Sequence, residues 1–399
     1  MTGLLAAARA GAEVSRVTSV GLSRRLHAHP ELGFEEERAV GWVGDVLATA
    51  GFSVDAGIAG LPTALRASVG SGPLVLALVA EYDALPGVGH ACGHNVIAAA
   101  SVCAGLALAP LADDLGITLQ LVGTPAEEGG GGKIVMLERG AFAGVGAAMM
   151  VHPTPREHAD PPTLAVAHLD VTWTGREAHA SAYPEDGVNA ADAATVAQVA
   201  VGLLRQHLRP DDRLHGIVTH GGDAPNIVPG RTTASFYARS ATLARLAELE
   251  PKLLRCFEAG ALATGCSMEV TAGSPAYSEA AYDPELVAVY ASHMGDLGRA
   301  VPVEVTQEAL RSAGSTDMAN VSLALPSIQP FVAIDSGGVG NHHPDFAAAC
   351  ATASADRAVL DGGVAMAWTA ITAATRPALR ERLLAGQAAR GTGRTPAGV

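Results

Sequence analysis

The sequence predicts an α/β protein of two domains, in which a ferredoxin-like α+β domain is inserted into a domain built on a mostly parallel sheet. Three observations favour this fold class. In the first 160 residues, short apolar runs bounded by Gly and Pro alternate with helical stretches, as in sheets whose parallel strands are joined by helices. Residues 164–271 follow a β-α-β-β-α-β order, which is typical of a ferredoxin-like unit. After about residue 280 the alternation of the first segment returns.

The first segment predicts two helices followed by alternating strands and helices. Apolar positions at helical spacing indicate a helix over residues 4–22 and another over 35–50, which Gly51 ends. The sequence between them, RRLHAHPELGFEE, contains Pro30 and is predicted to be a loop. The further expected elements are strands at 63–69, 74–79, 117–122 and 147–151, and helices at 95–108 and 133–138.

The inserted segment begins after Pro161-Pro162. Its expected elements are strands at 164–174, 216–221, 232–239 and 267–271, and helices at 189–208 and 243–264. The domain boundaries are therefore placed at 1–165 for the first part of the larger domain, 166–279 for the inserted domain and 280–399 for the second part. The tail after about residue 380 is rich in Arg, Gly and Ala, and we expect its last dozen residues to be mobile.

Composition argues against two classes of partner. Forty acidic residues against 26 basic ones give a net charge of −14, which argues against sequence-independent binding of nucleic acid. No apolar run approaches the roughly 20 residues that span a bilayer, and the N-terminus lacks the pattern of a signal peptide, so we expect no membrane association. The five cysteines have no regular spacing, so we expect free thiols and a cytoplasmic location.

The densest cluster of chemically active side chains is GHACGHN, residues 89–95, which follows the apolar run LVLALVA. Cys92 and His94 are two residues apart, so in an extended segment both side chains leave the same face. A thiolate and an imidazole so close together suit zinc or a similar divalent ion. A single Cys-x-His pair is more often structural, so this cluster alone leaves both interpretations open.

A second cluster, TPAEEGGGGK at residues 124–133, places two adjacent carboxylates after the predicted strand 117–122. Ligands of open α/β sheets bind at this end of the strands. One glutamate of such a pair can ligate a metal while its neighbour remains free as a general base. The alternative is a phosphate-binding loop, which is disfavoured because carboxylates repel phosphate and because Ile134, and not Ser or Thr, follows Lys133.

Three histidines complete the set of candidate metal ligands. His152 ends the apolar run AMMVHP, and His342 and His343 lie in GVGNHHP. Any one of them taken singly would more often be an ordinary surface or core residue. Their clusters follow apolar runs, at places where the loops of a sheet can converge, and this favours a shared site.

Taken in order, the motifs of the chain resemble those of the M20 metallopeptidases and amidohydrolases: HPELGFEEE (29–37), EYDALPGVGHACGHN (81–95), GTPAEEGGGGK (123–133), MMVHP (149–153), GREAHASAYP (175–184) and NHHPDF (341–346). The resemblance extends over roughly residues 22–375 and looks closest to the amidohydrolase branch, subfamily D. That branch includes aminobenzoyl-glutamate hydrolases, auxin-conjugate and hippurate hydrolases and dipeptidases of β-alanyl-lysine type. EYDALPGVGHACGHN and GSTDMANVS look most like the last group.

The resemblance implies a site with two divalent metal ions. The implied ligands are Cys92, His94, Glu128, His152 and His342, and Glu127 matches the general base that acts on a metal-activated water. His342 is preferred to His343 because the family pattern is His, any residue, Pro. Cys and His ligands favour zinc, whereas carboxylate and imidazole also accept manganese or cobalt.

The resemblance also implies roles for four residues around the metals. Asp83 matches a residue that orients a ligand histidine, although it could instead only cap the turn into Leu85-Pro86. His179 matches a histidine that donates to the oxyanion, in its own site or in the site of a partner subunit. Asn226 and Arg239 match residues that hold the carbonyl or carboxylate of the substrate. An ordinary loop histidine and a structural salt bridge remain alternatives for His179 and Arg239.

The implied function is hydrolysis of the amide bond of a small N-acyl or N-aminoacyl amino acid, with the inserted domain as a lid and as the contact of a homodimer. The alternatives are a dipeptidase of β-alanyl-lysine type, an aminopeptidase acting on longer peptides and a binding homologue that has lost catalysis. The complete ligand set and Glu127 argue against the last. Asn95, where most relatives have Asp, and Glu81, where many have Asp, bear on substrate class and leave hydrolysis standing.

Overall fold

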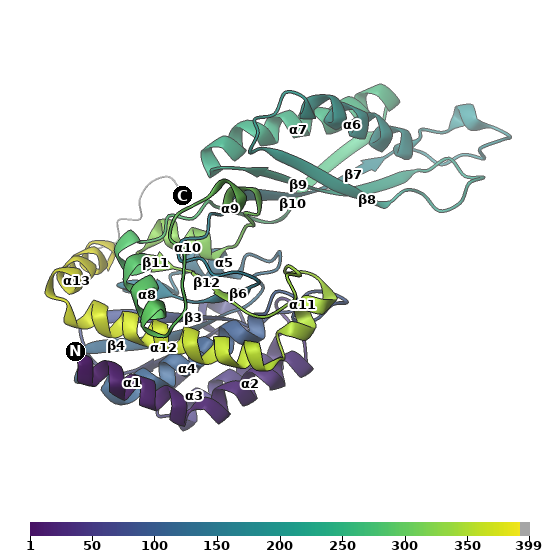
Figure 1. Ribbon diagram of the computed structural model, residues 1–399. Helices are drawn as coiled ribbons and strands as arrows, with labels where there is room; N and C mark the ends of the chain where they lie inside the picture. Colours follow the sequence, from purple (N-terminus) through teal and green to yellow (C-terminus); the bar gives the residue numbers. More distant parts are fainter. Residues whose placement is uncertain (392–399) are drawn as a thin grey trace. The chain divides into compact units, whose positions relative to one another are not determined.

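The computed structural model describes residues 1–391, and the chain divides into two compact units (Figure 1). Unit 1 contains Met1–Pro162, Ala280–Ala313 and the chain from Asp317 onward. Unit 2 contains Thr163–Glu279 and the short segment Gly314–Thr316. The last dozen residues, which we expected to be mobile, begin within the helix α13 (Pro377–Gly391). The rest of them lie outside the described residues.

The helices of unit 1, besides α13, are α1 (Thr2–Val14), α2 (Arg16–Ala28), α3 (Glu37–Thr49), α4 (His94–Leu108), α5 (Gly132–Glu138), α8 (Pro284–Asp296), α9 (Gln307–Arg311), α10 (Met318–Ala324), α11 (Pro344–Ala349) and α12 (Ala353–Thr375), with short 3-10 turns η1 (Ile58–Gly60) and η2 (Ala109–Leu111). Its strands are β1 (Ser53–Ala56), β2 (Leu65–Val69), β3 (Leu74–Glu81), β4 (Ile117–Thr124), β5 (Ala147–Met149), β6 (His152–Thr154), β11 (Ser327–Ile328) and β12 (Phe331–Ala333). The loop expected from residue 24 begins only after Ala28, because the helical pattern of α2 continues up to the residues before Pro30.

The main sheet of unit 1 has the strand order β1-β2-β4-β3-β5-β11. The four strands β4, β3, β5 and β11 pair in parallel, as the alternation of strands and helices predicts. β1 and β2 add an antiparallel edge, so the sheet is mixed. The connection from β1 to β2 holds only η1 and a few turn residues, which is too short for the crossover that a parallel pair requires.

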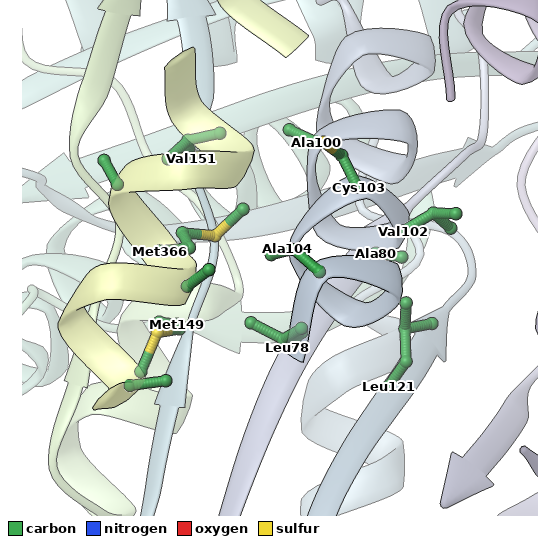
Figure 2. Packing of buried hydrophobic residues seen from close by; sticks show 14 of the residues in the cluster. Leu78, Ala80, Ala100, Val102, Cys103, Ala104, Leu121, Met149, Val151 and Met366 are labelled. Atoms are coloured by element: carbon green, nitrogen blue, oxygen red, sulfur yellow. The ribbon is translucent and has the colours of Figure 1, made fainter. Parts of the chain in front are cut away.

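Strand β3 is buried on both faces, which explains its nearly continuous apolar sequence. Leu76, Leu78 and Ala80 belong to the core cluster that includes α4 and α12, whereas Ala77 and Val79 belong to the cluster on the opposite face. Figure 2 shows Met366 of α12 beside Ala100 and Ala104 of α4, next to Leu78 and Met149 of the sheet. The sheet is therefore held between two helical layers.

The register of the parallel strands determines where the chemically active loops lie. Glu81, the last residue of β3, is the pairing partner of Thr124, the last residue of β4. The loops that carry Asp83 and Glu127 therefore begin side by side at the carboxyl edge of the sheet. This is the edge at which ligands bind to open α/β sheets.

Unit 2 is a four-stranded antiparallel sheet with two long helices. Its elements are β7 (Ala165–Thr174), η3 (Pro184–Asp186), α6 (Ala190–Arg205), β8 (Arg213–His220), β9 (Arg231–Ser240), α7 (Leu243–Thr264) and β10 (Ser267–Tyr277). The order β10-β7-β9-β8 with antiparallel pairing confirms the ferredoxin-like prediction. Trp173 and Phe236 of the sheet pack on Phe257 of α7, so the helices cover one face of the sheet.

Two helical segments are long and apolar enough to cross a membrane by length and composition alone: His94–Leu111 and Ala353–Thr375. Within unit 1 they are 78% and 89% buried, respectively. Their apolar surfaces are therefore covered by protein, as expected for core helices.

Gly132 provides a test of the backbone packing behind the loop of the two glutamates. A Cβ atom at Gly132 would lie 1.9 Å from the carbonyl oxygen of Pro125, so we expect Gly132→Ala to force this loop apart and to destabilise the fold by roughly 1–3 kcal/mol. Gly41, exposed in α3 with nothing within 4 Å of its Cβ position, is the matched control. We expect Gly41→Ala to stabilise the fold by roughly 0.5–1 kcal/mol. Equal thermal denaturation midpoints for the two variants would contradict this packing argument.

Candidate metal centre

Cys92 and His94 are brought together by a turn at the start of α4, and not by an extended segment as the sequence suggested. Gly93 between them adopts a left-handed conformation with φ of +83°. A Cβ atom at Gly93 would lie 2.4 Å from Cγ of Pro153. Only glycine therefore allows the backbone to turn this close to the strand β6.

His94 is held from one side and is free of hydrogen bonds on the other. Its Nδ1 lies 2.9 Å from the carbonyl oxygen and 3.0 Å from Oδ1 of Asp83. Its Nε2 is buried without a hydrogen-bond partner and lies 3.7 Å from Glu127 and 3.8 Å from Glu128. An imidazole fixed through Nδ1 with a buried, unpartnered Nε2 is the arrangement of a metal-ligating histidine.

Asp83 connects the two loops at the carboxyl edge of the sheet. Its Oδ1 faces His94, and its Oδ2 accepts a hydrogen bond from the backbone N–H of Glu128 at 2.9 Å. Burial raises the pKa of Asp83, but His94, the backbone N–H of Glu128 and the charge of Lys133 together outweigh this effect, and the pKa is lowered below its ordinary value. Asp83 is therefore an anion that fixes both a histidine ring and the backbone of the glutamate loop.

Two groups of donor atoms share Cys92. In the first group, Cys92, His94 and His152 each offer an atom within 4.8 Å of the others, and in the second group Cys92, Glu128 and His342 do so. Cys92 Sγ lies 3.5 Å from His152 Nε2, and Glu128 lies 3.5 Å from His342 Nε2. Sulfur, nitrogen and oxygen donors of these types suit zinc and related divalent ions, so the residues fit a pair of metal ions with a common thiolate.

The structure brings His342, and not His343, to this cluster. His342 has a positive φ of 68°, and its backbone N–H donates to the carbonyl oxygen of Ala91 at 2.8 Å. His343 instead accepts a hydrogen bond from the N–H of Asp345 and caps the helix α11. The two adjacent side chains therefore serve different purposes.

The buried environment shifts the protonation of the candidate ligands. Burial, opposed in part by Glu81, lowers the pKa of His152 to about 4, which leaves the neutral imidazole that binds metals. Burial and the charge of Glu128 raise the pKa of the Cys92 thiol well above its ordinary value. Metal binding at Cys92 must therefore release a proton, because the thiolate is the ligand.

Glu127 and Glu128 both lie beside His94, but their other neighbours differ. Glu128 belongs to the donor group with His342, whereas Glu127 has oxygen atoms within 4.8 Å of Glu81 and Asp317. Burial, together with the charges of Glu81 and Glu128, raises the pKa of Glu127 well above its ordinary value. A raised pKa makes the ionised carboxylate a stronger base, which suits a group that accepts a proton and later returns it.

Three residues that were not among the predicted site residues line this cluster: Glu81, Lys133 and Asp317. Lys133 Nζ lies 2.5 Å from Glu81 Oε1 and 2.6 Å from Asp317 Oδ1, and all three side chains are buried. The sequence contains weak signals of a role for two of them: Lys133 is one of only two lysines in the chain, and Asp317 lies in the GSTDMANVS motif. The pairing of residues so far apart in sequence was not visible from one chain.

The candidate substrate residues lie in unit 2, in two places. His179 and Asn226 lie on two exposed loops that are joined to each other, since Ala180 N donates to Asn226 O at 3.0 Å and Val228 N donates to Ala178 O at 2.9 Å. The loops extend beyond the end of the sheet at which β7 ends (Figure 1). His179 and Asn226 therefore share one end of unit 2.

Arg239 lies toward the opposite end of the same sheet. It pairs with Val166 in the sheet register, whereas Arg231, next to the loops, pairs with Thr174. Eight residues of strand correspond to about 26 Å at ~3.3 Å per residue. Arg239 donates to Ser315 Oγ at 2.7 Å, and none of the carboxylates in the described part of the chain forms an ion pair with it.

Comparisons with known proteins show the family of this chain. The family model "Peptidase family M20/M25/M40" matches residues 77–358. The chain is 36% identical to the mouse Xaa-Arg dipeptidase over 377 residues, which covers 90% of this chain and 86% of the mouse protein. It is 30% identical over 279 residues to a p-aminobenzoyl-glutamate hydrolase subunit from Escherichia coli, covering 64% and 58% of the two chains.

Solved structures share the fold at lower sequence identity. An aminobenzoyl-glutamate utilization protein from Klebsiella pneumoniae superposes with a TM-score of 0.71 at 19% identity, covering 90% of this chain and 97% of that one. A Bacillus subtilis protein described as a dinuclear metal binding peptidase gives a TM-score of 0.65 at 20% identity, covering 90% and 98%. The chain therefore belongs to peptidase family M20/M25/M40 and is a hydrolase of that metallopeptidase and amidohydrolase family.

Proposed function

We propose that this protein is a two-metal hydrolase that cleaves the amide bond of a small N-acyl or N-aminoacyl amino acid. The observation that carries the proposal is the pair of donor groups that share Cys92, with the buried carboxyl group of Glu127 beside them. The fold and the family membership support the same reaction class. The test is turnover of a panel of dipeptides and N-acyl amino acids by the protein after reconstitution with Zn²⁺, Mn²⁺ or Co²⁺.

In this proposal Cys92, His94 and His152 would hold one ion, and Cys92, Glu128 and His342 would hold the other. Bound divalent ions polarise a scissile carbonyl group and lower the pKa of water. Glu127 takes the proton of the attacking water on a carboxylate oxygen and delivers it to the departing nitrogen. Asp83 keeps the His94 ring in the orientation that leaves Nε2 available. Zinc is the metal that this donor set favours.

We propose that the substrate is a dipeptide, and that its C-terminal residue carries a free carboxylate and a basic side chain. The relatives from mouse and human that cover 90% of this chain are named Xaa-Arg dipeptidases. The guanidinium of Arg239 can bind a carboxylate with two parallel hydrogen bonds. The net charge of −14 attracts a basic substrate. N-acyl amino acids are the second candidate class, because a further relative is named an IAA-amino acid hydrolase.

We further propose that the chain acts as a homodimer through unit 2, in which His179 and Asn226 serve the site of the partner subunit. Arg239 and these loops are about 26 Å apart, which exceeds the length of a dipeptide several times over. This separation supports the proposal that Arg239 and the two loop residues serve different sites. In the proposal Arg239 binds substrate in its own subunit. Val199 and Leu203 of α6 and Ile217 of the edge strand β8 are exposed and offer apolar surface for the contact.

The five free cysteines support a cytoplasmic location.

Glu127→Gln tests the general base. The amide keeps the size of the side chain but cannot accept the proton, so we expect turnover to fall roughly 10²–10⁴-fold. Metal content and thermal denaturation should remain close to those of the unmodified protein, because Glu127 is not among the proposed ligands. Turnover within a few-fold of the unmodified protein would remove Glu127 from the mechanism.

Cys92→Ala tests the shared ligand. Loss of the thiolate removes a donor from both groups at once, so we expect fewer than two metal ions per chain by elemental analysis. Cys256→Ser, in α7 of unit 2, is the matched control and should leave the metal content unchanged. Two ions per chain in Cys92→Ala would show that the thiolate is not shared.

A mixture of two inactive variants tests whether His179 acts on the partner subunit. We expect His179→Ala to lower turnover roughly 10²–10³-fold, as for loss of an oxyanion donor. Random pairing of His179→Ala with Glu127→Gln chains gives one complete site in half of the dimers, so about a quarter of the full activity should return on mixing. A mixture that remains inactive, although the chains exchange, would place His179 in its own site.

A further inference from the structure

Lys133 is a lysine sealed inside unit 1. It is the second residue of α5, directly after the run of four glycines, and its side chain is 0% exposed. Of the 26 basic residues in the chain, only Lys133 and Lys252 are lysines. Lysine is almost never fully buried unless its charge is paired, because removing an ammonium group from water is costly. A fully buried lysine beside the metal centre therefore requires an explanation.

The ammonium group of Lys133 is held by two buried carboxylates from distant parts of the chain. Nζ lies 2.5 Å from Glu81, at the end of β3, and 2.6 Å from Asp317, which precedes α10. The backbone N–H of Lys133 donates to the second carboxylate oxygen of Asp317 at 2.8 Å. Burial lowers the pKa of Lys133, but Asp317 and Glu81 more than offset this effect, so the group remains a cation.

Glu127 is the third carboxylate of the same cluster. Glu81, Glu127 and Asp317 each offer an oxygen within 4.8 Å of the other two, and all three are buried. Such a set of carboxylate oxygens is the kind of environment that hard cations occupy in proteins. Here the ammonium group of Lys133 lies against two of the three carboxylates, so a positive charge is already supplied by the chain itself.

We propose that Lys133 is a tethered counter-ion that takes the place of a third cation in the Glu81–Glu127–Asp317 cluster and thereby positions Glu127 for catalysis. The inference rests on the proposed function of Glu127. Without the ammonium group the three carboxylates would repel one another, and Glu127, on a loop, would be displaced from its place beside His94. Among the described residues, the ion pairs of Lys133 are with Glu81 and Asp317 and not with the proposed metal ligands, so we regard it as a positioning residue.

The first measurement compares Lys133→Met with Lys252→Met, which makes the same change at a position in α7 of unit 2. Met keeps the length of the side chain and removes the charge. We expect the turnover number of Lys133→Met to fall at least ~10²-fold with KM changed only a few-fold, because misplacing a catalytic group affects turnover first. Metal content should remain at two ions per chain. A turnover number within threefold of that of Lys252→Met would overturn the proposal.

The second measurement separates charge from packing. Lys133→Met combined with Asp317→Asn removes one positive and one negative charge, so the cluster keeps its net charge. The metal-free protein gives a readout that does not depend on activity. We expect its thermal denaturation midpoint to fall by roughly 5–10 °C in Lys133→Met, since one partner of a buried ion pair has been removed. The midpoint should recover in part in the double variant.

The double variant also decides the matter if Lys133→Met does not fold. The proposal requires that the double variant folds, binds two metal ions and turns over substrate at least ~10-fold faster than Lys133→Met. A double variant that is unfolded, or no more active than the single variant, would assign Lys133 a packing role and overturn the proposal. Failure of the proposed function is distinguishable, because the unmodified protein would then turn over none of the substrate panel while the denaturation midpoints still report on the charge cluster.

Discussion

The burial of many carboxylates at one edge of the central sheet is the constraint on which the rest of the structure depends. Glu81, Asp83 and Asp317 are at most 1% exposed, and Glu127 is 6% exposed. Removing each such ion from water costs several kcal/mol, which only nearby positive charge and hydrogen bonds can offset. The positive charge comes from within the chain on one side, where Lys133 lies. On the other side the donor groups around Cys92 are suited to receive it from metal ions.

The loops that carry these groups contain tight turns. Ala126 and His342 have positive φ angles of 54° and 68°, a conformation that is uncommon outside glycine. Each is compensated by a hydrogen bond, from Ala126 N to the buried carboxylate of Glu36 at 2.8 Å and from His342 N to Ala91 O at 2.8 Å. Residues with an unfavourable backbone conformation persist at functional sites when surrounding contacts, such as these hydrogen bonds, hold that conformation. The backbone of both turns is therefore held by contacts within the chain.

The sequence predicted the features that depend on local pattern. The alternation of strands and helices predicted the parallel core and the ferredoxin-like unit, and both are confirmed. The antiparallel edge of β1 and β2 was not predicted, because short strands carry no signal of their pairing direction. The cluster of Glu81, Lys133 and Asp317 was not predicted either, since three residues that are 52 and 184 positions apart meet only through the topology of the sheet.

Local pattern also misjudged how Cys92 and His94 come together. Their spacing suggested an extended strand, but the left-handed turn at Gly93 places His94 at the start of α4. What the sequence could predict here was the type of donor, and what it could not predict was the turn. The same distinction applies to His342 and His343, whose roles follow from backbone conformation and not from residue type.

The two units differ in the physical environment of their chemically active residues, and this difference has a consequence for catalysis. Most of the chemically active groups of unit 1 are buried, although His342 is exposed, so electrostatic interactions among the buried groups are strong. His179 and Asn226 are exposed on loops that are tied mainly to each other. A hydrogen-bond donor in bulk water stabilises a developing negative charge weakly, because water competes for it and must reorganise. His179 can therefore contribute to turnover only when another surface covers it, so exclusion of water from these loops is a necessary step of any mechanism that uses His179.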